Sequence, residues 1–133
     1  MPRLSAESSP STAILLIAHG SRRASANADL VRLATLIGER TDFAAIEIGY
    51  LELAEPTIPQ GAQACVERGA QRVVMLPYFL SAGEHVCGDL ERYRQEFSSA
   101  HPNTEFRLCS PLGLHPLVVD AVLARLDEGL RDG

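Results

Sequence analysis

Histidines recur directly after strand-like stretches of this sequence, where chemistry-bearing residues of α/β proteins gather. His19 follows the unbroken apolar run of residues 13–18, and His85 and His115 follow two later runs. A neutral imidazole binds divalent first-row metals and accepts protons near neutral pH. The spacing therefore indicates a metal-handling or acid–base site assembled from separate segments, with His19 as its first candidate residue.

Carboxylates and cations accompany these histidines. Glu52 and Glu55 follow the second strand-like stretch, and Ser21 and Arg22 follow His19. Two histidines and one carboxylate, with coordination positions left open, are typical of a labile divalent-metal site rather than a closed zinc site. A cation such as Arg22 near a helix N-terminus destabilises the helix by about 0.3–1 kcal/mol. Binding of a carboxylate or phosphate by Arg22 would offset this cost.

Each histidine also has a purely structural interpretation. His19 before a Gly-Ser pair is compatible with a helix cap, and His85 with a tight turn. His115 directly precedes Pro116 and is more readily explained as structural than as catalytic. His101 lies in a polar loop and is expected at the surface. His19 and His85 are therefore the first candidates for functional residues. For Glu52 a functional and a structural role are about equally well supported.

Four strands and four helices must position these residues. We expect strands at residues 13–18, 43–51, 72–78 and 105–109, and helices at residues 24–40, 59–68, from 86 onward, and 116–130. Strictly alternating strands and helices predict a three-layer α/β sandwich with a parallel sheet and helices on both faces. Glu47 favours an edge position for the second strand and so the strand order 2-1-3-4.

Three further expectations follow from this arrangement. The carboxyl ends of parallel strands share one edge of the sheet, so His19, Glu52, His85 and His115 are expected to be neighbours. We expect each of the three histidines just before a helix, whose positive end disfavours the imidazolium form. The inner face of the last helix is expected to comprise Val119, Val122, Leu123, Leu126 and Leu130.

Bulk properties place the chain among single-domain globular proteins. It has 133 residues, 46% hydrophobic and 22% charged, with a net charge of −5 that argues against general nucleic-acid binding. Residues 1–12 are expected to form a flexible tail and residues 13–133 one domain. The three scattered cysteines are typical of reduced thiols in a cytoplasmic protein, and no apolar run is long enough to span a membrane.

Four blocks of the sequence resemble the CbiX family of sirohydrochlorin chelatases in its short, single-domain form. The blocks are residues 16–22, 51–56, 76–90 and 111–116, in the family's order and spacing. The resemblance implies insertion of Co²⁺ or Fe²⁺ into sirohydrochlorin, on the way to cobalamin or sirohaem, by a chelatase-like homodimer. The metal ion is a substrate here, and no permanently bound cofactor is expected.

The resemblance also implies roles for individual residues. His19 and His85 correspond to the metal-handling and catalytic pair, with Glu52 as their carboxylate partner. Sirohydrochlorin carries eight carboxylates, which Ser21, Arg22 and Arg23 are suited to anchor. The remaining expected substrate contacts are Leu53, Tyr78, Phe79, Leu80 and Ser81. Residue 84 varies among relatives, so Glu84 is given no role.

Two other functions remain open at this point. A metal or tetrapyrrole carrier would use the same ligands without catalysis. A histidine phosphatase also has a His-Gly pair after its first strand, but it requires Arg before that histidine, where this chain has Ala18. The sequence leaves the choice among cobalt, iron and nickel open, since all three accept such ligands.

Overall fold

A computed structural model describes residues 11–132, so the expected tail at residues 1–12 lies outside them except for its last two residues, of which Thr12 begins β1. The elements alternate along the chain as predicted: β1 (Thr12–Ala18), α1 (Ala24–Arg40), β2 (Ala45–Tyr50), α2 (Ile58–Glu67), β3 (Arg72–Pro77), α3 (Glu84–Ala100), β4 (Glu105–Leu108) and α4 (Pro116–Asp132). The strands form one parallel sheet in the order β2-β1-β3-β4, which confirms the predicted topology.

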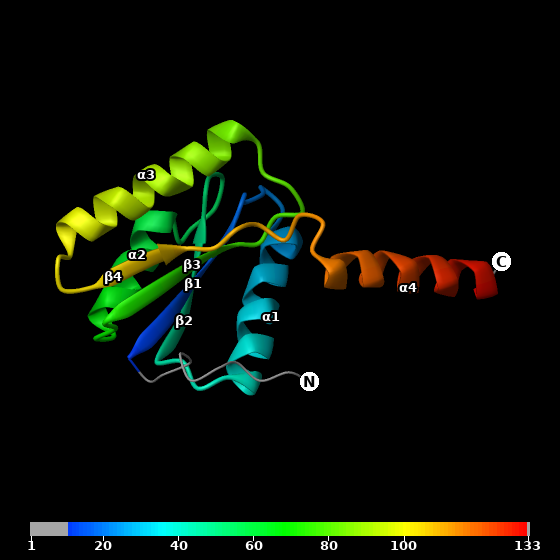
Figure 1. The fold of residues 1–133 in the computed structure, drawn as a ribbon, viewed down its shortest axis with the longest axis horizontal. Helices are drawn as coiled ribbons and strands as arrows, with labels where there is room; N and C mark the ends of the chain where they lie inside the picture. Colours follow the sequence, from blue (N-terminus) through cyan, green and yellow to red (C-terminus); the bar gives the residue numbers. More distant parts are fainter. Residues whose placement is uncertain (1–10, 133) are drawn as a thin grey trace.

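The central strand β1 is apolar because both of its faces are covered. Leu15 and Ile17 pack with α2 and α3 on one face, whereas Ile14 and Leu16 pack with Leu30 of α1 on the other. Figure 1 shows α1 on one side of the sheet and α2 and α3 on the opposite side. The continuous apolar run of β1 thus follows directly from its position in the middle layer.

The edge position of β2 is also as predicted. Glu47 on this strand keeps its carboxylate partly exposed and lies 3.7 Å from the guanidinium of Arg68. Behind it, α2 approaches the sheet closely at Gly61, where a Cβ atom would lie 2.4 Å from the carbonyl oxygen of Ile48. The helix begins with a capping box, in which the Thr57 side chain accepts from the Gln60 N–H and the Gln60 side chain accepts from the Thr57 N–H.

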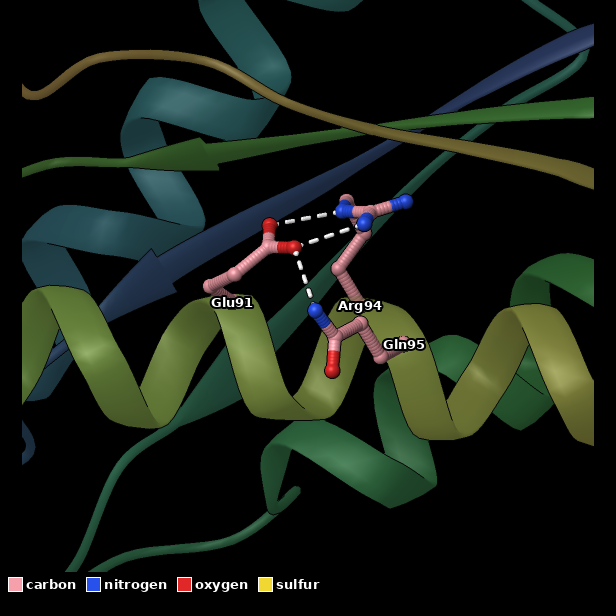
Figure 2. Close-up of polar contacts among 3 residues, drawn as sticks. All are labelled: Glu91, Arg94 and Gln95. Carbon is pink, nitrogen blue, oxygen red and sulfur yellow. Dashed lines mark hydrogen bonds and ion pairs between the residues drawn. The ribbon is translucent and has the colours of Figure 1, made fainter.

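Polar contacts also stabilise the exposed surface of α3. Two guanidinium nitrogens of Arg94, Nε and Nη2, donate to the Glu91 carboxylate at 2.7 and 2.6 Å, and the Gln95 amide donates to it at 3.1 Å (Figure 2). Chiefly through the hydrogen bonds from Arg94, this arrangement holds the pKa of Glu91 below its usual value. These three residues therefore stabilise α3 itself, and they do not contribute to the edge of the sheet near the start of α3.

The last helix differs from the expectation. α4 forms where predicted, but its expected inner face (Val119, Val122, Leu123, Leu126 and Leu130) is exposed. Figure 1 shows α4 running away from the sheet, and among residues 11–132 it makes no extensive contact with a strand or another helix. The prediction of an inner face was wrong for the single chain, because periodicity identifies an apolar face but not the surface that covers it.

Candidate active site

His19 is placed by a tight turn at the carboxyl end of β1. The backbone N–H of Glu52 donates to the carbonyl oxygen of His19 at 2.9 Å, and that of Leu51 donates to Ala18 at 2.9 Å. Gly20 turns the chain with φ of 93°, and a Cβ atom there would lie 1.8 Å from the Glu52 carbonyl oxygen. Only glycine fits this position, and the turn brings the His19 and Glu52 segments together as predicted.

The ring of His19 lies against an aromatic side chain from the neighbouring strand segment. Its centroid is 4.3 Å from that of Phe79, in a stacked arrangement. Phe79 is buried, whereas the imidazole is exposed. Phe79 was expected to contact substrate. In the structure it contacts the ring of His19, on the side of that ring that faces the core.

β3 leads from the same edge of the sheet towards His85. The N–H of Tyr78 donates to Ile17 at 2.7 Å, so the β1 and β3 ends are hydrogen-bonded side by side. His85 lies in the first turn of α3, which begins at Glu84, and its side chain is exposed. The expectation that His85 precedes the helix was therefore wrong by two residues, because Gly83 rather than a later residue is the N-cap.

The expected three-ligand set is not complete within one chain. Among the described residues, no group of three or more His, Cys, Asp and Glu side chains is placed to hold a metal ion. The structure therefore does not bring His19, His85 and Glu52 together as a closed site. A site that delivers its metal needs open coordination positions, which solvent or the receiving macrocycle can occupy.

The residues expected to anchor carboxylates lie beside His19. The Ser21 hydroxyl accepts a hydrogen bond from the Arg23 N–H at 3.0 Å, and Arg23 is the N-cap of α1. The N-cap position of α1 has no side-chain capping hydrogen bond, so the Ser21 side chain does not cap this helix. Arg22 and Arg23 are exposed, and no ion pair joins either to a carboxylate in the described part of the chain.

Exposed apolar side chains lie in the segments that follow β2 and β3 at this edge of the sheet. Leu53, Tyr78 and Leu80 are among the exposed large hydrophobic residues, and Ser81 next to Leu80 is also exposed. Leu53 adopts φ of 65°, the one positive value among the described residues that are not glycine. Exposed apolar side chains beside two histidines and two arginines suit a large, flat, acidic ligand.

His115 has a structural contact. Its Nδ1 atom accepts a hydrogen bond from the N–H of Leu117 at 3.1 Å, at the first turn of α4. The ring therefore satisfies one backbone donor that the helix start leaves free. The structural interpretation of His115 from the sequence agrees with this contact.

Asn27 and Tyr50 support the site and were missed in the sequence. The Asn27 side chain accepts from the Ser21 N–H at 2.9 Å and donates to the Ser21 carbonyl at 2.8 Å. The Tyr50 hydroxyl donates to the Asn27 carbonyl at 2.7 Å, and burial raises the pKa of Tyr50. An amide side chain in the first turn of a predicted helix, after a glycine turn, was the available signal.

Comparison with known proteins gives a consistent result. The CbiX family model matches residues 13–129. A sirohydrochlorin cobaltochelatase of Priestia megaterium is 33% identical over 90% of this chain and 39% of its own length. A chloroplastic sirohydrochlorin ferrochelatase of Arabidopsis thaliana is 33% identical over 88% of this chain and 52% of its own.

A solved structure shares the fold. The sirohydrochlorin chelatase SirB from Bacillus subtilis subspecies spizizenii, in complex with cobalt, superposes with a TM-score of 0.80 at 31% identity, covering 88% of this chain and 50% of that one. This chain thus spans about half the length, or less, of these three similar proteins.

Proposed function

The chain belongs to the CbiX family, and we propose that it inserts a divalent metal, Co²⁺ or Fe²⁺, into sirohydrochlorin. The observation that carries the proposal is the side-by-side exit of two segments from the sheet. His19 leaves β1 and the segment towards His85 leaves β3, where the Tyr78 N–H donates to Ile17 at 2.7 Å. Both imidazoles are exposed at this edge, where an incoming ion can reach them.

The reaction exchanges two pyrrole N–H protons of the macrocycle for one metal ion. In our proposal His19 and His85 hold the incoming ion, which keeps exchangeable water in its remaining positions. As the ion passes to the pyrrole nitrogens, an imidazole or the carboxylate of Glu52 accepts the released protons. The hydrogen bond between the Glu52 N–H and the His19 carbonyl keeps these two groups on adjacent turns.

Binding of the macrocycle needs both charge and apolar surface. Arg22 and Arg23 are proposed to pair with its carboxylates, with Ser21 and Ser81 as hydrogen-bonding partners. The exposed side chains of Leu53, Tyr78 and Leu80 are proposed to contact the ring. Phe79 then has a positioning role, since it is buried against His19.

We further propose that the active form is a cytoplasmic homodimer. The chain spans half of the cobalt-bound Bacillus structure, so a second copy would supply the surface that the longer chain has in its other half. All three cysteines are free, which suits a reducing compartment. Among residues 11–132, no helix is both long and apolar enough to span a bilayer.

Anaerobic absorbance spectroscopy tests the proposed activity. Sirohydrochlorin is mixed with Co²⁺, Fe²⁺ or Ni²⁺, with and without the protein, and the visible spectrum is followed over time. Insertion that is faster with protein than without it, for Co²⁺ or Fe²⁺, is the expected result. Binding of the macrocycle and the ion with no acceleration would identify a carrier and overturn the proposal.

A further inference from the structure

Leu53 has a backbone conformation that leucine rarely adopts. Its φ is 65°, in the left-handed region, and every other positive φ within residues 11–132 belongs to a glycine. In that region the Cβ atom of an L-residue crowds the backbone, a cost that glycine avoids. A bulky residue in a strained conformation points to a use of its side chain, since glycine would form the same turn more easily.

The loop that contains Leu53 is held from both ends, so its neighbours determine its shape. The N–H of Tyr50 donates to the carbonyl of Pro56 at 2.8 Å, which closes the loop after β2. Inside the loop, Leu51 packs against the core on one face of the sheet and Ala54 against the core on the other face. The conformation of Leu53 is therefore imposed by the contacts on either side of it.

The strained residue lies next to the candidate site. Glu52 directly precedes it and donates its N–H to the carbonyl of His19 at 2.9 Å. The carbonyl oxygen of Glu52 is also so close to Gly20 that a Cβ atom there would lie 1.8 Å from it. Leu53 thus follows the point where the two turns of the site touch, and it presents apolar surface there.

The side chain of Leu53 contributes little to the stability of the chain alone. Burial stabilises in proportion to the apolar area removed from water, and 53% of Leu53 stays exposed. Strain and exposure therefore both disfavour leucine at this position in the free protein. A flat apolar ligand that covers the side chain would remove this surface from water, and the fixed loop would lose little conformational freedom on binding.

We propose that Leu53 is a specificity-determining residue, whose strained backbone holds its side chain against the apolar face of the macrocycle. Arg22 and Arg23 pair with carboxylates, which many anionic ligands carry, whereas Leu53 recognises the flat ring itself. Because Leu53 follows Glu52, the bound ring lies close to the carboxylate proposed to accept its protons. This proposal rests on the proposed function, which supplies the identity of the ligand.

Alanine and glycine at position 53 separate the strain from the contact. Both remove the side chain beyond Cβ, but only Leu53→Gly relieves the strain. In chemical denaturation the unfolding equilibrium constant of Leu53→Gly is expected to be about threefold lower than that of Leu53→Ala. Leu36 is the matched control, since it is 47% exposed within α1, where glycine is worse than alanine. Leu36→Gly should therefore have an unfolding constant about fivefold higher than Leu36→Ala.

Binding of metal-free sirohydrochlorin, followed by absorbance, measures the contact. Its dissociation constant is expected to rise about fivefold in both Leu53→Ala and Leu53→Gly. Leu53→Met, which keeps an apolar side chain of similar size, and Leu36→Ala should bind like the wild type. The dissociation constant for Co²⁺ alone, measured by calorimetry, should be the same in all of these variants, because the imidazoles are unchanged.

Three results would each overturn the role of Leu53. These are a Leu53→Gly variant no more stable than Leu53→Ala, unchanged sirohydrochlorin binding in both, and weaker Co²⁺ binding in both, which would show a distorted site. Failure of the proposed function gives a different result. If the wild type and its Leu53 variants bind sirohydrochlorin as expected but insertion is not accelerated, the protein is a carrier and the role of Leu53 stands. A wild type that binds no sirohydrochlorin would overturn both.

Discussion

The imidazole of His19 stacks on the ring of Phe79, with centroids 4.3 Å apart and planes inclined by 26°. The two residues come from different strand ends, β1 and β3, and Phe79 is buried while His19 is exposed. The ring of Phe79, which is buried in the core, thus orients the exposed ring of His19, one of the two proposed metal ligands. Since misplacement of a reacting group by about 1 Å can cost roughly 100-fold in rate, this contact is expected to matter for activity.

Replacing Phe79 by Leu tests this contact. The proton NMR signals of the His19 ring are expected to shift because the ring current of Phe79 is lost, and the rate of metal insertion to fall about tenfold. The free energy of unfolding should decrease by only about 1 kcal/mol, since the apolar volume is largely kept. Phe97→Leu is the control, because Phe97 stacks with Tyr93 in the α3 layer. Unchanged His19 signals in Phe79→Leu would refute the positioning role.

Gly20→Ala is expected to disrupt the turn that carries His19. The new Cβ atom would lie 1.8 Å from the Glu52 carbonyl oxygen, at a residue with φ of 93°. Chemical denaturation should show a loss of about 3 kcal/mol or more, accompanied by loss of insertion activity. Gly69→Ala has a similar φ of 82° and nothing within 4 Å, so it isolates the conformational cost, about 1 kcal/mol. Equal losses in the two variants would show that the Glu52 contact is unimportant.

His115→Ala is expected to weaken α4 without affecting the chemistry. Loss of the hydrogen bond from the Leu117 N–H should lower the stability of the helix start by about 1 kcal/mol. Circular dichroism would report the helix, and the insertion rate should stay within about twofold of the wild type, as for other helix caps. His115→Asn, which retains a capping acceptor, should restore the helix. A large loss of activity in a variant with intact α4 would assign His115 to the site.

Cys65 is expected to make the protein sensitive to alkaline pH. Burial raises the pKa of this thiol to about 12, with the charge of Glu47 adding to the effect and Arg68 opposing it. The unfolded chain releases the proton near the ordinary value of 9.0 while the folded chain keeps it, so this stability is complete below that pH. It is lost as the pH rises from 9.0 towards about 12. Denaturation of the wild type should show a slope up to about 1.4 kcal/mol per pH unit steeper than Cys65→Ala. If the stabilities of the wild type and Cys65→Ala changed with pH in parallel, the raised pKa of the buried Cys65 thiol would be contradicted.

Much of the fold was predictable because local patterns and topology agree. The run Ile14 to Ile17 is apolar on both faces, which only a central strand of a covered sheet requires. Glu47 marked the edge strand, and the apolar spacing within residues 24–40 gave the bounds of α1. The meeting of the His19 and Glu52 segments followed from the rule that parallel strands end at one edge.

The predictions from the sequence were wrong or incomplete where the structure depends on which distant residue a side chain contacts. The stripe of α4 was correctly identified as apolar, but no sequence pattern says that its own sheet does not cover it. Asn27 had a local signal, its amide in the first turn of a predicted helix, but the hydrogen bond that it receives from Tyr50 spans 23 residues and has no local signature. The completeness of a metal site likewise depends on distances between loops, and the described residues hold no group of three ligands.

The most direct test of the account is metal insertion by His19→Ala and His85→Ala, compared with His101→Ala. His101 ends α3 and contacts Phe106, so it controls for the loss of a histidine away from the site. We predict that both site variants remain folded and that their anaerobic insertion rates with Co²⁺ and Fe²⁺ fall by about 100-fold or more, while His101→Ala keeps the wild-type rate. Full activity in either His19→Ala or His85→Ala would contradict the proposed pair.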